Sequence, residues 1–514
     1  MIRFEKLSAS LPQPAYDAKQ VQTNEPAVAK QCQLSLFELM TRAGASALAC
    51  IQQYYPTAKR IWVFCGKGNN GGDGLVLARL ALEQGCQVSV FVMAEAAQIR
   101  GDAQLALQQL QTVAAVQIRY IASLEVLHQQ QWLSQPQPNV IVDALLGTGF
   151  QGELRKLLAT TITFINQQTA AIISLDIPSG LSADTGQVTS VAVHADCCIT
   201  FVAIKRGLLT GKAADHVGTL YLADLGVGAV FHQQVSSELV VQGERAVPRL
   251  PKRLKTAHKG NTGLVLTIGG RQGLPGAIRL ASEAALRCGA GLVAVACAPN
   301  NQAMVLAGRP ELMLVEIEPQ QLVQSTVFDK AGVLVIGPGL GRDQAAMALL
   351  SAVLAQHKTM IVDADALMLL AQLPIHKPRH NWILTPHPGE AASLLGCEIA
   401  DIEADRFAAV QKIVQQYGGI CVLKGAGSLI SDGQSCYINT SGNAGMASGG
   451  MGDVLSGIIA ALLLQMPNGF EAVRLAVYLH GKSADVVAAQ RGERGLLASD
   501  LLLPLQMLIN QSES

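Results

Sequence analysis

The sequence contains few aromatic residues and few charges for its length. Of its 514 residues only 4% are aromatic and 15% are charged, whereas half are hydrophobic and 49 are glycine. Lys plus Arg equals Asp plus Glu, at 38 each, so no net charge favours nucleic acid or an acidic membrane. We therefore expect no nucleic-acid partner. This composition is typical of α/β enzymes with buried parallel strands.

Membrane and export signals are also missing. No run of 18 apolar residues occurs, and residues 1–19 carry charges from Arg3 onward without an apolar core. We therefore expect no membrane span and no signal peptide. The eleven cysteines lack a CxxC or other zinc-type spacing, and most lie in apolar runs. This pattern favours reduced thiols in a cytoplasmic protein.

The chain is long enough for two or three domains. Short apolar runs alternate with helical patterns, except in residues 231–256, where polar and basic residues and two prolines interrupt the pattern. We expect one α/β domain at 1–230, a linker at 231–256 and a different α/β domain at 257–514. The predicted strands are Arg60–Cys65, Gln87–Met93, Asn139–Val142, Ala171–Leu175, Cys197–Ala203 and Thr219–Leu222, then Leu264–Ile268, Leu292–Cys297, Glu311–Glu316, Gly332–Ile336, Thr359–Val362, Trp382–Leu384 and Ile420–Leu423.

A glycine-rich segment, CGKGNNGGDG at residues 65–74, follows the first of these strands. Gly66, Gly68 and Gly71 satisfy the GxGxxG pattern, and Glu95 lies near the distance expected of a ribose-binding acid, but this pattern alone is weak evidence. The Asn-Asn-Gly-Gly-Asp stretch adds amide oxygens and a carboxylate that plain cofactor binding does not need. We predict a loop here, with a helix from Leu75.

Oxygen ligands also follow two other predicted strands of the first half. Asp143 and Asp176 each come at a strand end, and Ser179 lies three residues after Asp176. Ligands bind beyond the carboxyl ends of strands in open α/β sheets. Asn70, Asp143 and Ser179 therefore suit a hard cation, and Asp176 could transfer protons. The alternative is that each residue caps a helix or stabilises a turn.

In the second half, glycine-rich or charged loops follow the strands. They are residues 268–277, 336–341 (IGPGLG), 362–365, 384–390 (LTPHPGE), 423–428 (LKGAGS) and 443–453 (NAGMASGGMGD). Open backbone N–H groups, Lys424 and a helix beginning at Asp453 suit the phosphates of a nucleotide. The alternatives are a flexible turn at 443–453, a surface ion pair for Lys424 and a satisfied loop histidine for His387. No Walker A or protein-kinase signature is present.

These motifs resemble those of a known family. The first half is similar to the NAD(P)H-hydrate epimerase domain through CGKGNNGGDG, VDALLGTG at residues 142–149 and SLDIPSGLSADTG at 174–186. The second resembles the ADP-dependent NAD(P)H-hydrate dehydratase through IGPGLG, LTPHPGE, LKGAG and NAGMASGGMGD. Together they resemble the bifunctional NAD(P)H-hydrate repair enzymes of bacteria. The resemblance implies an N-terminal Rossmann-like three-layer domain followed by a C-terminal ribokinase-like α/β domain.

The resemblance also implies an activity and the residues that bind its substrates. The first domain would interconvert R and S hydrates of NADH or NADPH, and the second would convert the S hydrate to NAD(P)H with ADP, giving AMP and phosphate. In the first domain the hydrate would be held by Asn69, Asn70, Gly71, Gly72, Asp73, Gly147, Thr148, Gly149, Phe150, Gln151, Gly152, Glu153 and Asp176. Asn70, Asp143 and Ser179 would bind a potassium ion.

In the second domain the resemblance assigns one set of residues to the hydrate and one to ADP. Ala277, Gly339, His387 and Asp453 would contact the hydrate, and ADP, entering with Mg²⁺, would be held by Lys424, Gly425, Ala426, Gly427, Ser428 and Gly452. Asp176 and Asp453 would be the catalytic residues. We also expect a homo-oligomer.

The sequence departs from the family pattern at three positions. Ser428 and Ser448 stand where threonine is usual, and Ala444 replaces a usual proline. The hydroxyl groups are retained, so only the stiffness of the loop at Ala444 is in doubt. Two other functions stay open: a ribokinase-class kinase of a vitamin-like alcohol, and a first half that senses a dinucleotide without converting it.

Overall fold

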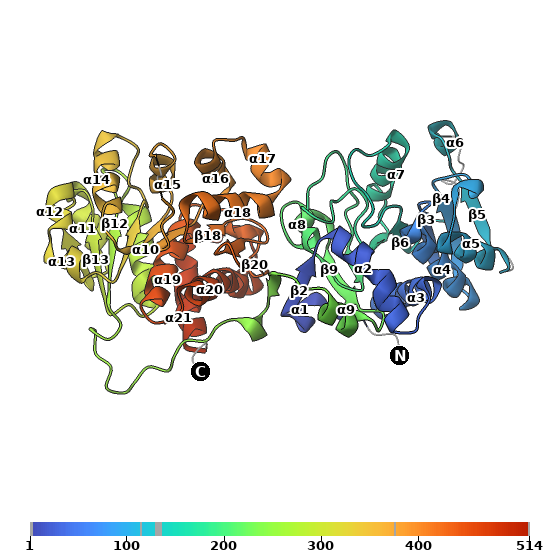
Figure 1. The fold of residues 1–514 in the computed structure, drawn as a ribbon, viewed down its shortest axis with the longest axis horizontal. Helices are drawn as coiled ribbons and strands as arrows, with labels where there is room; N and C mark the ends of the chain where they lie inside the picture. The colour runs from blue at the N-terminus through green and yellow to red at the C-terminus, as the bar shows by residue number, and fades with distance from the viewer. Residues whose placement is uncertain (1–3, 114–115, 129–135, 375–376, 512–514) are drawn as a thin grey trace. The chain divides into compact units, whose positions relative to one another are not determined.

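The computed structural model describes residues 4–113, 116–128, 136–374 and 377–511, and the chain divides into two compact units, 1–240 and 241–514 (Figure 1). The boundary lies within strand β11 (Leu239–Gln242), inside the segment 231–256. That segment also contains the end of helix α9 (Gly228–Gln234) and a short 3-10 helix at Glu244–Ala246. Phe231 is fully buried in the core of the first unit.

The first unit is built on an eight-stranded sheet in the order β1-β10-β8-β7-β6-β3-β4-β5. All neighbouring strands are parallel except β1, which is antiparallel to β10. The strands are β1 (Glu5–Lys6), β3 (Arg60–Cys65), β4 (Gln87–Val92), β5 (Gln117–Tyr120), β6 (Val140–Ala144), β7 (Ala171–Leu175), β8 (Cys197–Phe201) and β10 (Thr219–Ala223).

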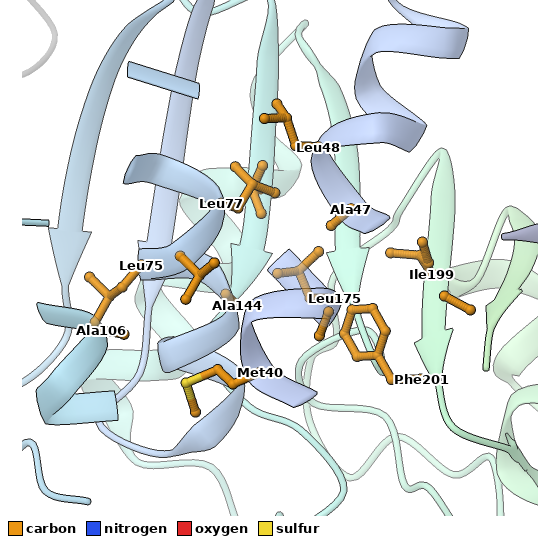
Figure 2. Close-up of a cluster of buried hydrophobic side chains, with 14 of the residues drawn as sticks. Met40, Ala47, Leu48, Leu75, Leu77, Ala106, Ala144, Leu175, Ile199 and Phe201 are labelled. Atoms are coloured by element: carbon orange, nitrogen blue, oxygen red, sulfur yellow. The ribbon is translucent and has the colours of Figure 1, made fainter. Parts of the chain in front are cut away.

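Helices cover both faces of this sheet, because alternate strand residues are apolar on each side. Val63 and Cys65 face one core with helices α3, α4 and α5, whereas Trp62 and Phe64 face a second core with α6 and α7. Figure 2 shows part of the first core, which includes Leu48 and Leu77 of the helices and, on the strands, Leu175 beside Phe201. The helices are α3 (Leu36–Tyr54), α4 (Asn69–Glu83), α5 (Asp102–Gln111), α6 (Leu124–His128) and α7 (Lys156–Asn166). The expected three-layer Rossmann-like arrangement is confirmed.

The expectation of a loop before Leu75 is wrong, because α4 already begins at Asn69. The glycines of its first turns allow this helix to pack closely against the neighbouring backbone and side chains. A Cβ at Gly71 would lie 2.0 Å from Gly66 O, and one at Gly74 would lie 2.7 Å from the side chain of Ala144. The first turns of α4 thus lie directly against the ends of β3 and β6, where a longer side chain would collide.

A short parallel pair, β2 (Gln13–Tyr16) with β9 (Ile204–Lys205), adds to the first unit. Helix α2 (Ala18–Gln31) follows β2 and starts with a capping box between Asp17 and Gln20. These elements bring Lys205 and Glu25 towards the ends of the main strands. The remaining helices of the unit are α1 (Leu7–Ser10), α8 (Ala213–His216) and α9.

In the second unit the strands run in the order β14-β13-β12-β15-β16-β17-β18-β19-β20. Neighbours from β14 to β18 are parallel, and β18, β19 and β20 form an antiparallel edge. The strands are β12 (Leu264–Ile268), β13 (Leu292–Ala296), β14 (Leu312–Val315), β15 (Val333–Ile336), β16 (Thr359–Val362), β17 (Trp382–Leu384), β18 (Ile420–Leu423), β19 (Leu429–Ser431) and β20 (Cys436–Asn439). The order reverses between β12 and β15, which is where such folds bind ligands.

Two groups of helices enclose this sheet, as Figure 1 shows. The core on one face includes residues of α10 (Pro275–Arg287), α11 (Gln302–Leu306), α19 (Met451–Leu463), α20 (Gly469–Arg491) and α21 (Leu502–Gln511). The second group is α14 (Gln344–Leu354), α15 (Asp365–Leu370), α16 (Pro388–Leu395) and α18 (Arg406–Tyr417), with α12 (Pro319–Val323), α13 (Thr326–Lys330) and α17 (Ile399–Ala404) nearby in sequence. The C-terminal unit has the expected ribokinase-like α/β fold.

Every predicted strand is present, each ending within two residues of its predicted bounds. Sequence reasoning missed β1, β2, β5, β9, β11, β19 and β20, most of which are short. Among the described residues, no single helix is both long and apolar enough to cross a membrane; α2 and α3 meet that criterion only as a pair bent by 105°. The eleven cysteines are all free thiols, and eight are buried.

Candidate active sites

The first candidate site is centred on Asp176, which directly follows β7. Its φ of 64° lies in the left-handed region, which few residues other than glycine adopt. The backbone N–H of Asp176 donates to Ile199 O at 2.8 Å, which fixes this turn to β8. The ammonium of Lys205 lies 2.6 Å from Asp176 Oδ1, and Thr200 Oγ1 donates to the same oxygen at 3.2 Å. Lys205 is only 2% exposed, and sequence reasoning missed it.

The three expected cation ligands lie around the backbone of Leu146. Asn70 Nδ2 donates to Leu146 O at 2.7 Å, and Leu146 N donates to Ser179 Oγ at 2.9 Å. Ser179 in turn donates to Asp143 through both its hydroxyl (2.6 Å) and its backbone N–H (2.9 Å). Burial raises the pKa of Asp143, although hydrogen bonds from Ser179, Ser174 and Leu145 act to lower it.

This group of residues fits a cation on two observations. The oxygen Asn70 Oδ1 is buried without a hydrogen-bond partner in the described part of the chain. Asp143 is fully buried, and the ion pairs of the described residues do not include it. Buried charges are normally paired or bound to a metal ion. The donors are oxygens, as a hard cation requires.

The loop after β6 borders the same site. A Cβ at Gly147 would lie 3.1 Å from Asn70 Cβ and 3.5 Å from Asp176 Oδ2, so Gly147 faces both residues. Gln22 of α2 donates to Thr148 Oγ1 at 3.1 Å. Phe150 N donates to Gly147 O at 3.1 Å. The remaining predicted residues of the loop, Gly149, Gln151, Gly152 and Glu153, are exposed, as is Asn69.

Two further carboxylates act on this site. Asp73 lies in the first turns of α4, between the buried Gly72 and Gly74, and Glu25 lies on α2. Burial raises the pKa of Asp73, Asp176 and Glu25 raise it further, and Lys205 acts in the opposite direction. Burial also raises the pKa of Glu25, against the effect of Lys205. Three carboxyl groups thus share one ammonium, an arrangement suited to proton transfer. Glu25 was not predicted.

The second candidate site is centred on Lys424, at the end of β18. Its ammonium lies 3.0 Å from Asp363 Oδ1 and 3.6 Å from Glu390 Oε2. Asp363 follows β16, is 1% exposed, and also accepts hydrogen bonds from Thr385 and Ser456, both at 2.8 Å. Burial acts to raise the pKa of Asp363, but Lys424 and these hydrogen bonds outweigh it and lower the pKa. Asp363 is buried and the Lys424 side chain is 20% exposed, so the pair differs from the surface ion pair of the alternative interpretation.

Asp453 is half-buried in the first turn of α19. The pKa of Asp453 is raised to about 7, mainly by burial. The negative charges of Asp363, Glu390 and Asp365 also raise it, whereas the positive charge of Lys424 lowers it. A carboxylate with a pKa near neutrality suits a general base at physiological pH. The preceding Gly450 has a φ of 90°, which favours glycine at the start of this helix.

The glycine loops bring other predicted residues towards this site. A Cβ at Gly452 would lie 3.1 Å from Lys424 Nζ and 3.8 Å from Asp363 Oδ2, so the first turn of α19 contacts the ion pair. A Cβ at Gly339 would lie 3.5 Å from the side chain of Ala277. Gly339 and Ala277 thus lie together where the strand order reverses, between β12 and β15.

His387 is the N-cap residue of α16. Its Nδ1 accepts from the backbone N–H groups of Gly389 (3.0 Å) and Glu390 (3.3 Å), so the ring carries its proton on Nε2 when neutral. That Nε2 lies 3.4 Å from Glu390 Oε1, and the side chain is 56% exposed. One ring nitrogen, Nδ1, thus has hydrogen-bond partners, as the alternative interpretation of His387 predicts. The ring itself remains accessible to a ligand.

Arg406 holds the LKGAG loop through hydrogen bonds to its backbone carbonyl groups. Sequence reasoning missed this residue. Arg406 is 1% exposed and donates to Lys424 O at 3.0 Å and Leu423 O at 3.3 Å. Gly425 must be a glycine here, because its φ is 142° and an added Cβ would lie 2.8 Å from Arg406 Nη2. Ser428 Oγ closes the loop by donating to Gly425 O at 2.9 Å. Gly425 and Ala426 are exposed, so the loop is open to a ligand.

No group of three or more His, Cys, Asp or Glu side chains able to hold a metal ion occurs among the described residues. In the second site, the carboxylate of Asp363 already accepts hydrogen bonds from Lys424, Thr385 and Ser456. The carboxylate of Glu390 accepts from the backbone N–H of His387 and forms an ion pair with Lys424. These acids thus act mainly on Lys424 and the backbone. A divalent cation here would need oxygen ligands from a bound phosphate.

Comparisons with known proteins assign both halves. A family model described as NAD(P)H-hydrate dehydratase matches residues 265–506, and one described as YjeF-related protein N-terminus matches residues 36–207. The chain is 42% identical over 502 residues to the bifunctional NAD(P)H-hydrate repair enzyme Nnr of Coxiella burnetii, covering 96% of this chain and 99% of that one. It is 42% identical over 508 residues to the enzyme of the same name from Escherichia coli, covering 99% and 96%.

Among solved structures, the chain is similar to a ribokinase-like superfamily protein of Enterococcus faecalis, with 34% identity, a TM-score of 0.48, and coverage of 52% of this chain and 93% of that one. It is also similar to the ADP/ATP-dependent NAD(P)H-hydrate dehydratase of Bacillus subtilis, with 29% identity, a TM-score of 0.48, and coverage of 52% and 99%. With two relatives at 42% identity over nearly their whole length, the chain belongs to the family of bifunctional NAD(P)H-hydrate repair enzymes.

Proposed function

We propose that this enzyme repairs NADH and NADPH hydrated on the nicotinamide ring, in two steps. The first unit interconverts the R and S hydrates, and the second converts the S hydrate to NAD(P)H with ADP, releasing AMP and phosphate. One observation carries the proposal. Each unit has a carboxylate that interacts electrostatically with a lysine near the carboxyl ends of its parallel strands. These are Asp176 with Lys205, and Asp453 with Lys424.

In the second unit we assign Asp453 as the general base. It takes the proton from the ring hydroxyl as the hydroxyl oxygen attacks the terminal phosphoryl group of ADP, and AMP leaves. Phosphate then leaves the ring as the C–O bond breaks and the neighbouring ring carbon loses a proton, which restores the double bond of the dihydronicotinamide. Backbone N–H groups of Gly449, Gly450 and Gly452 lie at the N-terminus of α19, where they offset negative charge on the transferred group.

The nucleotide is assigned to Lys424, Gly425, Ala426, Gly427, Ser428 and Gly452. The exposed part of the LKGAG loop and the nearby ammonium of Lys424 support this assignment. The hydrate is assigned to Ala277, Gly339, His387 and Asp453. Mg²⁺ enters with the phosphates of ADP, since the acids around Lys424 are already bonded.

In the first unit we assign Asp176 as the residue that moves protons at the hydroxyl-bearing carbon of the hydrate. Its second carboxylate oxygen, Oδ2, faces Gly147 in the loop assigned to the hydrate. Asn69, Asn70, Gly71, Gly72, Asp73 and residues 147–153 complete that assignment. Asn70, Asp143 and Ser179 would hold K⁺, whose charge would neutralise Asp143 and order the loop at Leu146.

The decisive experiment incubates the full chain with mixed R and S hydrates and either ADP or ATP. Full recovery of absorbance at the NADH band with phosphate release is expected with ADP, and requires both activities. Recovery of only the S fraction would mean that the first unit binds a dinucleotide without converting it. A stable phosphorylated product without recovered NADH would identify a small-molecule kinase instead.

Two variants test the catalytic assignments. Asp453→Asn should retain ADP binding but lose dehydration, and near-normal turnover would exclude the role of Asp453. Asp176→Ala should lose R/S exchange while dehydration of the S hydrate continues. Exchange that remains faster than in buffer would exclude the role of Asp176.

We also propose a cytoplasmic location and a homo-oligomeric state. The eleven free cysteines, eight of them buried, support a reducing compartment. Sedimentation velocity of the purified chain measures the oligomeric state, and a single species at the mass of one chain would exclude an oligomer.

A further inference from the structure

The ammonium of Lys205 has a complete set of hydrogen-bond acceptors. It lies 2.6 Å from Asp176 Oδ1, 2.6 Å from Phe201 O and 3.1 Å from Thr200 Oγ1. A lysine ammonium carries three N–H groups, and three acceptors occupy them all. Lys205 in this arrangement is a charged donor with no free lone pair. It is therefore suited to hold another group, and neither to attack a carbon nor to accept a proton.

The contact with Lys205 distinguishes the two oxygens of Asp176. Oδ1 receives both Lys205 and Thr200, whereas Oδ2 faces the loop assigned to the hydrate, 3.5 Å from where a Cβ at Gly147 would lie. The backbone of Asp176 is fixed by its N–H bond to Ile199 O, and Cys198 Sγ donates to Asp176 O at 3.5 Å. One oxygen is thus anchored and the other is directed at the substrate loop.

Lys205 is also the counter-charge for a group of acids. The titratable groups that face Asp176 are Glu25 on α2, Asp73 on α4, the Cys198 thiol on β8 and Lys205 on β9. Without the ammonium, three carboxyl groups would share a partly buried site with no positive charge among them. Like charges at short range disfavour the ionised form, so a proton would then be retained within the group.

We infer that Lys205 is a positioning residue of the epimerase reaction, which holds Asp176 Oδ1 and turns Oδ2 towards the hydrate. This inference rests on the proposed function of the first unit. In the step that it serves, Oδ2 takes the proton of the hydrate hydroxyl, the O–H electron pair forms a carbonyl, and the bond between the hydroxyl-bearing carbon and the ring nitrogen breaks, its electron pair passing to the nitrogen. The nitrogen then adds to the opposite face of the carbonyl and the oxygen regains the proton, which gives the other epimer and leaves Asp176 unchanged, so no oxidant or further reactant is needed.

Lys205→Met tests the inference, because methionine has a similar length and no charge. We expect R/S exchange at pH 7 to fall on the order of 100-fold in kcat with little change in KM, a size typical of general acid–base effects. The acid limb of the pH profile should move to higher pH. Lys205→Arg should restore part of the rate, and Thr200→Val, which keeps the charge, should cost much less. Exchange within about threefold of the wild type in Lys205→Met, with an unmoved profile, would overturn the inference.

Lys205→Gln covers the possibility that Lys205→Met does not fold, because glutamine keeps a polar group beside Thr200 Oγ1 and Phe201 O. It also removes the ammonium, so exchange should fall by a similar factor with little change in KM. Exchange close to the wild-type rate in Lys205→Gln would overturn the inference. Dehydration of the S hydrate by the second unit measures the amount of intact chain, and hydrate binding is the folding control for the first unit. Absence of exchange in the wild type would refute the proposed function itself, which is a different outcome.

Discussion

Lys424 Nζ lies 3.0 Å from Asp363 Oδ1 and 3.6 Å from Glu390 Oε2, so one ammonium connects residues that follow three neighbouring strands, β16, β17 and β18. Burial acts to lower the pKa of Lys424, but Asp363, Glu390 and Asp453 outweigh it and raise the pKa. The lysine therefore remains charged when buried. It has two tasks, since it neutralises Asp363 and presents a positive charge beside Gly452.

Lys424→Met should separate these two tasks. It leaves the buried Asp363 without its counter-charge, so we expect the free energy of unfolding of the second unit to fall by about 3 kcal/mol. ADP binding, measured by calorimetry, should also be lost. In the double variant Lys424→Met/Asp363→Asn the buried group at position 363 is neutral as well, so much of the stability should return while ADP binding should not. If the double variant bound ADP like the wild type, Lys424 would have only a structural role.

The pH dependence of dehydration should follow Asp453, whose pKa is raised to about 7 by burial and neighbouring carboxylates. A general base acts when ionised, so kcat/KM should rise with pH through about 7 and level off above it. Glu390→Gln removes one of the negative charges that raise this pKa, and should move the acid limb to lower pH. Asp365→Asn is the matched comparison, because the charge of Asp365 has a smaller effect on this pKa than that of Glu390 and should move the limb less. A profile that stays flat between pH 5.5 and 8.5 would exclude Asp453 as the base.

The parallel strands and the main motifs could be predicted from sequence for a physical reason. Buried parallel strands are continuous apolar runs, and their carboxyl ends carry glycine and acid clusters within a few residues. Asp453, Lys424 and Asp176 all lie in such clusters. The structure places each of them beyond the end of its strand or at the start of the next helix.

The residues that sequence reasoning missed act through contacts between distant segments. Lys205 lies on a two-residue strand without a motif, and its contact with Asp176 joins residues 29 positions apart in the chain. Arg406 lies on α18, and its backbone contacts to Leu423 and Lys424 give no local pattern. The start of α4 was placed too late because its glycines allow close packing, although glycine clusters usually indicate loops.

Gly147→Ala should impair the epimerase without unfolding it. Gly147 does not have a positive φ, so alanine can adopt its backbone conformation. The new methyl group would lie 3.5 Å from Asp176 Oδ2 and 3.1 Å from Asn70 Cβ, in the space assigned to the hydrate. We expect R/S exchange to fall more than about tenfold in kcat/KM, since small displacements at a reacting centre have large effects.

Gly149→Ala is the matched control for this variant. Gly149 belongs to the same loop assigned to the hydrate, but its added Cβ would contact only Gln22 Nε2, at 3.7 Å, so exchange should fall much less than in Gly147→Ala. Both variants are measured for R/S exchange and for dehydration of the S hydrate, which should be unchanged in each. Equal rates of exchange for the two variants would place the hydrate away from Gly147.

His480 should make the second unit sensitive to acid. It lies on α20, is 8% exposed, and its Nε2 is buried without a hydrogen-bond partner in the described part of the chain. Burial lowers its pKa to about 4, from an ordinary value of 6.5. Below pH 6.5 the unfolded chain binds a proton at this position and the folded chain does not. Stability is therefore lost as the pH falls from about 6.5 to 4, by about 2 kcal/mol between pH 8 and pH 5.

His480→Gln should remove this part of the pH dependence. Calorimetric scans of the full chain at pH 8 and pH 5 measure it, with the transition of the second unit identified as the one that ADP moves to higher temperature. His216→Gln is the matched control, because His216 is also buried with a lowered pKa but lies in the first unit. We expect the acid-induced shift of the ADP-sensitive transition to shrink in His480→Gln and to persist in His216→Gln. An equal shift in both variants would mean that another group, not His480, binds the proton on unfolding.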